Sequence, residues 1–279
     1  MTAAEPLLVG RLRRQLEAGR EERILHELEH VHVVDIAQAL RDMSRAEQVK
    51  LFQVLDRVRA AEVLQCLDED TLRELLPQLD HERLATVLDL VPVHRTVALI
   101  TRLRLEEQTM IARLLPDDRA EEIERLLSYR EGTAGRLMSP SVASMPETAT
   151  VAEALGRIAA GGGEAAPLVY VVDEHKHLIN VVPIERLIVA APQSPLRSLE
   201  HRPVISVTLD TAEEEVAQVI RRYSLWSAPV LDEQGRVVGT ISIHDVIPAI
   251  QRGRQPMTSN SWLGRTRRWL LTRLLRYLV

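Results

Sequence analysis

Apolar residues recur every twelve positions between residues 20 and 127, which divide into nine rows of equal length. The last place of each row is apolar from the second row onward: Met43, Leu55, Leu67, Leu79, Val91, Leu103, Leu115 and Leu127. The eighth place is apolar from the third row onward: Leu51, Val63, Leu75, Val87, Leu99, Ile111 and Ile123. The first place often holds a residue that caps or opens a helix: Ser44, Asp56, Asp68, Asp80, Pro92 and Pro116. Each row therefore predicts one helix of about eight or nine residues and a turn, and the stacked rows predict an all-α solenoid.

The pattern changes after residue 130, where two segments repeat one order of strands and helices. The first segment predicts a helix over 150–160, a hairpin over 168–182 and a short helix over 184–190. The second predicts strands over 204–209, 228–232 and 236–243, with helices over 212–223 and 244–251. Two β-α-β-β-α units of this kind would pair about a pseudo-twofold axis and leave a cleft between them.

These elements predict an α+β multidomain protein. We expect a helical superhelix over 1–130, one β-α-β-β-α unit over 131–194, a second over 195–255 and a basic amphipathic helix over 256–279. With 279 residues, of which 46% are hydrophobic and 27% charged, the chain is long enough for two domains with cores of their own.

Charge is distributed unevenly along the chain. The net charge is −5, yet seven arginines and no acidic residue follow Asp245. Residues 261–279 predict a cationic helix with leucines near one face, which we expect to lie on an anionic membrane surface. The residues expected to contact that surface are Trp262, Arg265, Arg268, Trp269 and Arg276. Packing of this helix against the acidic body of the chain or against a partner is the alternative.

Cysteine usage and hydropathy bear on the compartment. Cys66 is the single cysteine, so a disulfide framework is excluded and a reducing cytoplasm is indicated. Because it stands at an apolar place of the repeat, we expect Cys66 to be a small buried apolar residue rather than a nucleophile. The chain has no run of about eighteen apolar residues, and its first residues lack the apolar region of a signal peptide, so no spanning segment is expected.

Catalytic motifs are missing from the sequence. It contains no nucleophile elbow, no His-Glu zinc signature and no cysteine cluster, and we therefore expect no enzyme. His26, His30 and His32 have a spacing that suits a transition metal on one helix face. No carboxylate or cysteine completes a recognisable ligand set with them.

The segment with binding character runs from Gly239 to Asp245, where a predicted strand ends and a helix begins. A hydroxyl at Ser242 and a carboxylate at Asp245 would project together at the helix N-terminus, which favours phosphate, and a carboxylate can accept both hydroxyls of a ribose. Alternatively, Ser242 only caps the helix, with Asp245 at its third position.

The paired units resemble a CBS-domain pair, whose nucleotide motif is a glycine, two residues, Ser/Thr, two residues and Asp. Gly239, Ser242 and Asp245 match that motif, and the resemblance implies that Ala228 and Pro229 also line the site. In the first unit Pro183 and Arg186 replace the hydroxyl and the carboxylate, so this half-site has lost its ribose ligand. The resemblance thus implies one adenine nucleotide, ATP, ADP or AMP, and a homodimer formed through the CBS pair.

The solenoid, the stretch EGTAGRLMSP at 131–140 and the second unit together resemble the cytosolic part of MgtE-type magnesium channels over about residues 20–250. In that family, magnesium ions bridge acidic residues of the two domains and close the pore. This sequence departs from the family's acidic pattern at 91–99, which reads VPVHRTVAL, and at 251–256, which reads QRGRQP, and it lacks the pore helices. These departures imply weakened magnesium sensing. Other acids would then have to hold the ion, and the candidate ligands are Asp68, Glu69 and Asp70.

The expected function is that of a regulatory, non-catalytic module in the cytoplasm. Its expected partners are a membrane transporter or the inner face of the membrane, and not nucleic acid. The alternative is a protein-interaction scaffold with empty CBS clefts, which a nucleotide titration would distinguish.

Overall fold

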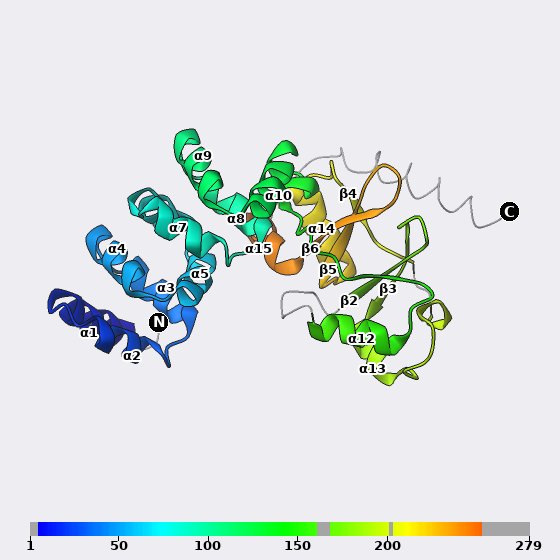
Figure 1. The fold of residues 1–279 in the computed structure, drawn as a ribbon, viewed down its shortest axis with the longest axis horizontal. Coiled ribbons are helices and arrows are strands. Elements are labelled where there is room, and N and C mark those ends of the chain that lie inside the picture. The colour runs from blue at the N-terminus through cyan, green and yellow to red at the C-terminus, as the bar shows by residue number, and fades with distance from the viewer. Residues whose placement is uncertain (1–4, 161–167, 201–202, 253–279) are drawn as a thin grey trace.

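Each twelve-residue row folds into one helix, as predicted. The computed structural model describes residues 5–160, 168–200 and 203–252. Its solenoid consists of α1 (Glu5–Glu17), α2 (Glu21–Leu28), α3 (Val33–Arg41), α4 (Arg45–Val54), α5 (Arg57–Cys66), α6 (Glu69–Leu75), α7 (His81–Leu88), α8 (Val93–Ile100), α9 (Leu105–Leu114) and α10 (Asp117–Ser128). A short 3₁₀ turn, Leu76–Gln78, extends α6. Helices two apart in sequence pack on each other, as α3 does on α5 and α5 on α7, and the helices follow an arc (Figure 1).

The caps and the apolar seam of the repeat also form as predicted. The carboxylates of Asp56, Asp68 and Asp80 accept hydrogen bonds from the backbone N–H three residues further on, each at 2.9 Å. Every apolar residue of the eighth place is buried, and so is every residue of the last place except Leu127, which is half-buried. Burial of this seam on neighbouring helices stabilises elements that would be too short to persist alone.

The prediction that Cys66 is buried is wrong. Cys66 is exposed at the C-terminal end of α5, in the eleventh place of its row. Leu90 and Leu114 hold the same place in later rows and are 48% and 45% exposed. Leu126 holds this place as well and is fully buried, so an apolar residue in the eleventh place does not by itself indicate burial.

Two small sheets follow the solenoid. The first has the order β1 (Ser144–Pro146), β2 (Leu168–Val172) and β3 (Leu178–Pro183), and the second β4 (Val207–Thr208), β5 (Ser227–Leu231) and β6 (Val237–Ser242). In each sheet the first strand is parallel to the second, the second is antiparallel to the third, and the last pair shifts register near its far end. The helices of the two units are α12 (Val151–Ala160), α13 (Ile184–Val189), α14 (Glu213–Tyr223) and α15 (Ile243–Arg252). The predicted pair of β-α-β-β-α units is therefore confirmed.

The short helix α11 (Ala134–Leu137) joins the solenoid to the second unit rather than to the first. The backbone N–H groups of Ala134 and Gly135 donate to the carbonyls of Thr211 and Leu209, at 2.8 and 2.9 Å. A side chain on Gly135 would meet the ring of Tyr129 at 2.8 Å, so only glycine allows this close approach. The joint fixes the end of the solenoid against the second unit.

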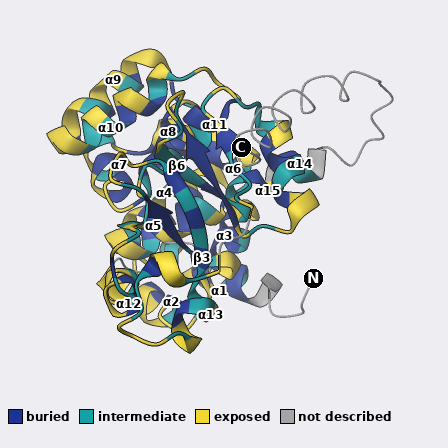
Figure 2. Cartoon of the chain, turned by 90° about the vertical axis from the view of Figure 1, so that its right-hand side faces the viewer, coloured by how far each residue is buried: buried dark blue, intermediate teal, exposed yellow. Residues whose placement is uncertain are grey.

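The hydrophobic core also joins the solenoid to the second unit and leaves the first unit separate. One continuous core runs from Leu8 through the solenoid to Ala249 in α15, and therefore includes the second unit. The first unit has a separate core around Val151, Val169 and Leu187. Figure 2 shows the buried residues on the strands and on the inner faces of the helices. Among the described residues, no helix is both long and apolar enough to cross a bilayer.

Candidate functional site

The candidate binding segment lies where β6 ends at Ser242 and α15 begins at Ile243. Asp245 is in the first turn of α15, and its side chain turns back toward the end of the strand. The backbone N–H and the hydroxyl of Ser242 both donate to Oδ2 of Asp245, at 2.9 and 2.6 Å. The carboxylate thus caps the helix start, and two of the three motif residues, Ser242 and Asp245, are hydrogen-bonded to each other.

The second oxygen of Asp245 is held by the solenoid. Oδ1 lies 3.2 Å from Nε2 of His94 and 3.2 Å from a guanidinium nitrogen of Arg95, and both residues are in α8. The side chains of Asp245 and His94 are only 6% and 10% exposed, whereas that of Arg95 is 33% exposed. A largely buried ion pair therefore connects the helical domain to the second unit.

The environment keeps Asp245 ionised. Burial raises the pKa of its carboxyl group, but the hydrogen bond and charge of His94, the hydroxyl of Ser242 and the charge of Arg95 outweigh burial and lower the pKa from 3.8 to about 2. A carboxylate that stays charged at neutral pH is a strong acceptor for hydroxyl groups.

The other predicted nucleotide residues lie close by. Ala228 and Pro229 are buried in β5 and pair with Ile241 and Thr240 of β6. A Cβ on Gly239 would come within 2.4 Å of the sulfur of Met138, so the glycine lets the segment after α11 pack against β6. All five predicted residues lie on the paired strands β5 and β6 or in the turn from β6 into α15, although Ala228 and Pro229, as neighbours in one strand, face opposite sides of the sheet.

The two β-α-β-β-α units meet through a buried tyrosine. The Tyr170 hydroxyl, on β2 of the first unit, lies 3.0 Å from Oγ of Ser227 and 2.6 Å from Oγ1 of Thr240 in the second unit. Burial raises the pKa of Tyr170, although both hydroxyl contacts oppose this shift. These contacts hold the two sheets together beside the candidate site.

The equivalent position in the first unit has no carboxylate. Pro183 caps the start of α13, and Arg186 forms an ion pair with Glu200. The structure therefore places a cation where the second unit has Asp245. Among the described residues, the position that corresponds to Asp245 therefore offers a ribose no carboxylate of its own.

The predicted magnesium ligands each have a partner within the chain. Asp68 accepts the N–H of Thr71 as the N-cap of α6 and lies 2.7 Å from Nε of Arg41. Glu69 and Asp70 lie 3.3 and 3.4 Å from the guanidinium of Arg73. Within the described ranges, no three His, Cys, Asp or Glu side chains form a group suited to a metal ion.

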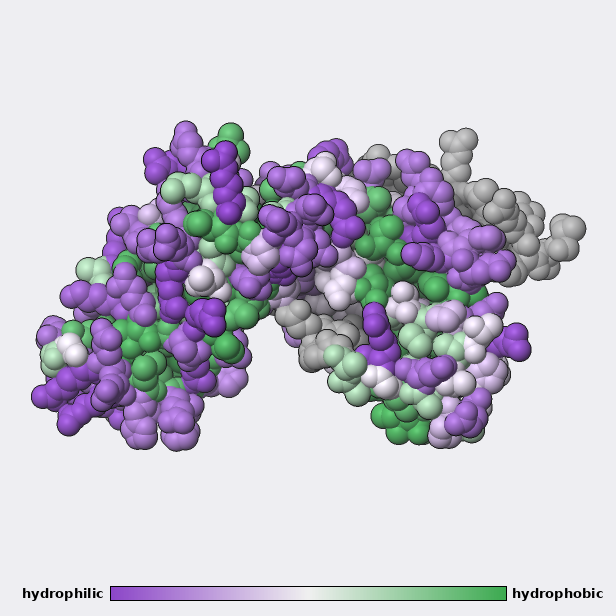
Figure 3. Space-filling model, in the orientation of Figure 1, coloured by the Kyte–Doolittle hydropathy of each residue, from purple (hydrophilic) through white to green (hydrophobic). Residues whose placement is uncertain are grey.

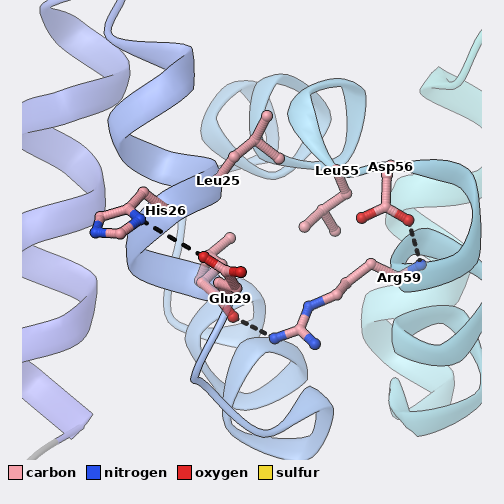
Figure 4. A pocket seen from close by; sticks show the side chains of 7 residues that line it. Leu25, His26, Glu29, Leu55, Asp56 and Arg59 are labelled. Atoms are coloured by element: carbon pink, nitrogen blue, oxygen red, sulfur yellow. Dashed lines mark hydrogen bonds and ion pairs between the residues drawn. The ribbon is translucent and has the colours of Figure 1, made fainter.

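The histidines at the start of the solenoid do not converge either. His26 lies 3.5 Å from the carboxylate of Glu29, and Nδ1 of His32 accepts the backbone N–H of Val34. An open pocket of about 560 Å³ lies between α2 and α5 (Figure 4). Its one arginine, Arg59, donates to the carbonyls of Leu28 and Val31, so the group best suited to a ligand is already used by the backbone.

The sequence patterns did not identify His94 and Arg95 as site residues. The signal lies in the fourth place of the repeat, where Arg59, Arg83 and Arg119 donate to backbone carbonyls of an earlier repeat. Arg95 holds the same fourth place but turns to Asp245 instead. Arginines in the fourth place of the repeat normally bind the backbone of the solenoid. One that stands next to a histidine, as Arg95 does next to His94, is therefore a candidate for a contact with another domain. The predicted membrane contacts, Trp262, Arg265, Arg268, Trp269 and Arg276, lie outside the described residues.

Two protein-family models match the chain. The model of the MgtE intracellular N domain matches residues 31–132, and the CBS domain model matches residues 134–192 and 196–252. Among curated proteins, the magnesium transporter MgtE of Thermus thermophilus is 37% identical over 154 residues, which are 53% of this chain and 34% of that protein. MgtE of Enterococcus faecalis is 33% identical over 135 residues, which are 48% of this chain and 30% of that protein. The chain thus spans about a third of the length of the curated relatives it matches.

Two solved structures share the whole arrangement. The cytosolic domain of the Mg²⁺ channel MgtE in complex with ATP is 30% identical, with a TM-score of 0.79, and the match covers 86% of this chain and 99% of that one. The soluble part of a magnesium transporter is 24% identical, with a TM-score of 0.79, and the match covers 89% of this chain and 99% of that one. The second likeness concerns the fold alone.

Proposed function

The chain belongs to the family formed by the cytosolic region of MgtE-type magnesium transporters, and we propose that it is a regulatory, non-catalytic module that binds an adenine nucleotide through its CBS pair. The observation that carries the proposal is the ionised carboxylate of Asp245 at the start of α15, beside Ser242 and Gly239. The ATP complex of a relative with 30% identity supports the choice of an adenine nucleotide.

We assign the ribose to Asp245, with Gly239, Ser242, Ala228 and Pro229 lining the site. The first unit contributes no second ribose site because Arg186 stands where the carboxylate is needed. One nucleotide per chain follows from this difference between the units.

Calorimetry with ATP and with 2′,3′-dideoxy-ATP tests the assignment. We expect one saturable site per chain and at least about tenfold weaker binding of the dideoxy analogue, since a hydrogen bond to a charged group contributes about 1.5 kcal/mol or more. In Asp245→Ala the two nucleotides should bind equally, whereas Arg186→Ala, at the lost half-site, should keep the discrimination. A preference for ATP that survives in Asp245→Ala would show that another residue holds the ribose.

We propose that the chain senses magnesium weakly. Val93 and His94 stand in a stretch where the family has acidic residues, and the candidate ligands Asp68, Glu69 and Asp70 are paired with arginines. Carboxylates that already neutralise guanidinium groups offer a hard cation less net charge. Magnesium is therefore the ligand of lower affinity in this proposal, and the nucleotide is the main ligand.

A homodimer formed through the CBS pair is part of the proposal. Ile188 and Ile247 hold equivalent places on α13 and α15, and they are 66% and 38% exposed. Val189 is 80% exposed on α13, where Figure 3 shows apolar side chains at the end of the first unit. Exposed apolar residues at matching places of both units fit a self-complementary contact about a twofold axis.

The proposed setting is the cytoplasm at the inner face of the membrane, with a membrane transporter as partner. The arginines and tryptophans of residues 262–279 support contact with anionic lipid. An interaction scaffold with empty CBS clefts is the second candidate, because the carboxylate of Asp245 is fully engaged within the chain. A scaffold would show no saturable nucleotide binding.

A further inference from the structure

We propose that helix α8 competes with the nucleotide for Asp245, so that the ion pair from His94 and Arg95 acts as a latch on the binding site. This inference rests on the proposed function, because it concerns the ribose contact of the same site. It adds a regulatory link between the helical domain and the CBS pair.

The first argument is the number of acceptor positions. A carboxylate offers about four lone-pair positions. Oδ1 of Asp245 serves His94 and Arg95, and Oδ2 serves the N–H and hydroxyl of Ser242. A ribose diol needs two of these positions, so it binds only after a present partner has left. Ser242 is on the same strand-to-helix turn as Asp245, which makes the two residues of α8 the partners that can separate.

The second argument is access. The side chain of Asp245 is 6% exposed, and the side chains that cover its outer oxygen come from α8. While the latch is closed, a ligand cannot reach that oxygen. Rotation of His94 and Arg95 away from Asp245 would uncover it without unpacking the core that the solenoid shares with the second unit.

The third argument is that the latch is imperfect. Nδ1 of His94 is buried and has no hydrogen-bond partner among the residues that the structure describes, and an unpaired polar atom of this kind disfavours the closed arrangement. Arg95 is 33% exposed, so water can solvate its guanidinium when it leaves Asp245. The contact can therefore be released by a ligand that replaces its hydrogen bonds.

The consequence is reciprocal coupling. If the closed latch excludes the nucleotide, the apparent dissociation constant equals the intrinsic constant divided by the fraction of molecules in which the latch is open. By linkage, a bound nucleotide releases α8 by the same factor. The helical domain would then respond to occupancy of the CBS pair through one shared carboxylate.

Calorimetric titration with ATP tests the competition. The variant His94→Ala/Arg95→Ala should bind ATP about tenfold more tightly than the wild type, and Arg95→Ala alone should lie between them. His94→Gln/Arg95→Lys keeps hydrogen-bond donors at both places and should stay near the wild type. Arg102→Ala removes an arginine at the end of the same helix, whose guanidinium donates to the carbonyl of Ala98, and should have no effect.

The outcomes separate the two proposals. Equal ATP affinity in all variants, with discrimination against dideoxy-ATP intact, would overturn the competition and leave the proposed function standing. Weaker binding in the double variant would also overturn it, because α8 would then be part of the nucleotide site. If neither wild type nor double variant binds ATP, the proposed function is wrong and the competition falls with it. The circular dichroism spectrum and the melting temperature of each variant establish that it is folded.

Discussion

Replacing Asp245 by asparagine tests the buried ion pair directly. The change keeps the shape of the side chain and removes the charge that His94 and Arg95 face. The pKa of Asp245 lies at about 2 in the folded chain, against 3.8 for the unperturbed group. Since each pKa unit corresponds to about 1.4 kcal/mol, the folded environment stabilises the ionised form by about 2 kcal/mol. We therefore expect Asp245→Asn to lower the free energy of unfolding by about 2 kcal/mol at pH 7.

The sign of the pH dependence follows from the lowered pKa. A depressed carboxyl pKa contributes stability that is fully present above the unfolded value near 3.8 and is lost as the pH falls through about 2. The difference between wild type and Asp245→Asn should thus be constant near neutrality and fall to about half its size by pH 3. Urea unfolding followed by circular dichroism at several pH values measures this difference.

Asp89→Asn is the matched control. The carboxylate of Asp89 lies 3.7 Å from Nε of Arg119 and its side chain is 42% exposed. An ion pair whose carboxylate is this exposed to water contributes less than about 1 kcal/mol. If Asp245→Asn costs no more than Asp89→Asn, or if its cost is the same at pH 3 and pH 7, the buried ion pair does not stabilise the fold as described.

Three further predictions concern packing, magnesium and the C-terminal segment. Gly239→Ala should destabilise the fold by about 1–3 kcal/mol, because its Cβ would overlap Met138. Gly156→Ala is the control: it lies in α12 with nothing within 4 Å of the added Cβ and should stabilise the fold by up to about 1 kcal/mol. Equal effects of the two changes in urea unfolding would contradict this reasoning. Magnesium over about 0–20 mM should change the radius of gyration little in small-angle scattering, and a large saturable contraction would mean that other acids, such as Asp68, Glu69 and Asp70, sense the ion. The full chain should co-sediment with anionic vesicles, less so at high salt, and a chain ending at Asn260 should not; equal sedimentation of both would assign residues 262–279 to a protein interface.

The fold could be predicted because its signals are local. Each solenoid row carries its own cap and its own apolar places, as Asp56 and Val63 illustrate, so the repeat specifies one helix without reference to distant residues. The same holds for the two hairpins, where Asp173 and Asp232 bind the backbone N–H groups of their own turns. Local hydrogen bonds of this kind leave a pattern in the sequence.

The contact of His94 and Arg95 with Asp245 could not be predicted, because α8 lies far from Asp245 along the chain. Asp245 and His94 are 151 positions apart, and no local period relates them. The path of the chain after α10 also depends on long-range contacts, since the N–H of Ser139 donates to the carbonyl of Thr240 in the second unit. Motif matching found the candidate residues Gly239, Ser242 and Asp245, but a motif contains no information on which domain packs over them.

A crystal structure of the full chain grown with ATP tests the central claim most directly. The account predicts a nucleotide in the second CBS unit, with both ribose hydroxyls within about 3 Å of the carboxylate of Asp245 and the side chains of His94 and Arg95 turned away from it. A nucleotide bound elsewhere while His94 and Arg95 still hold Asp245, or an empty cleft at saturating ATP, would contradict it.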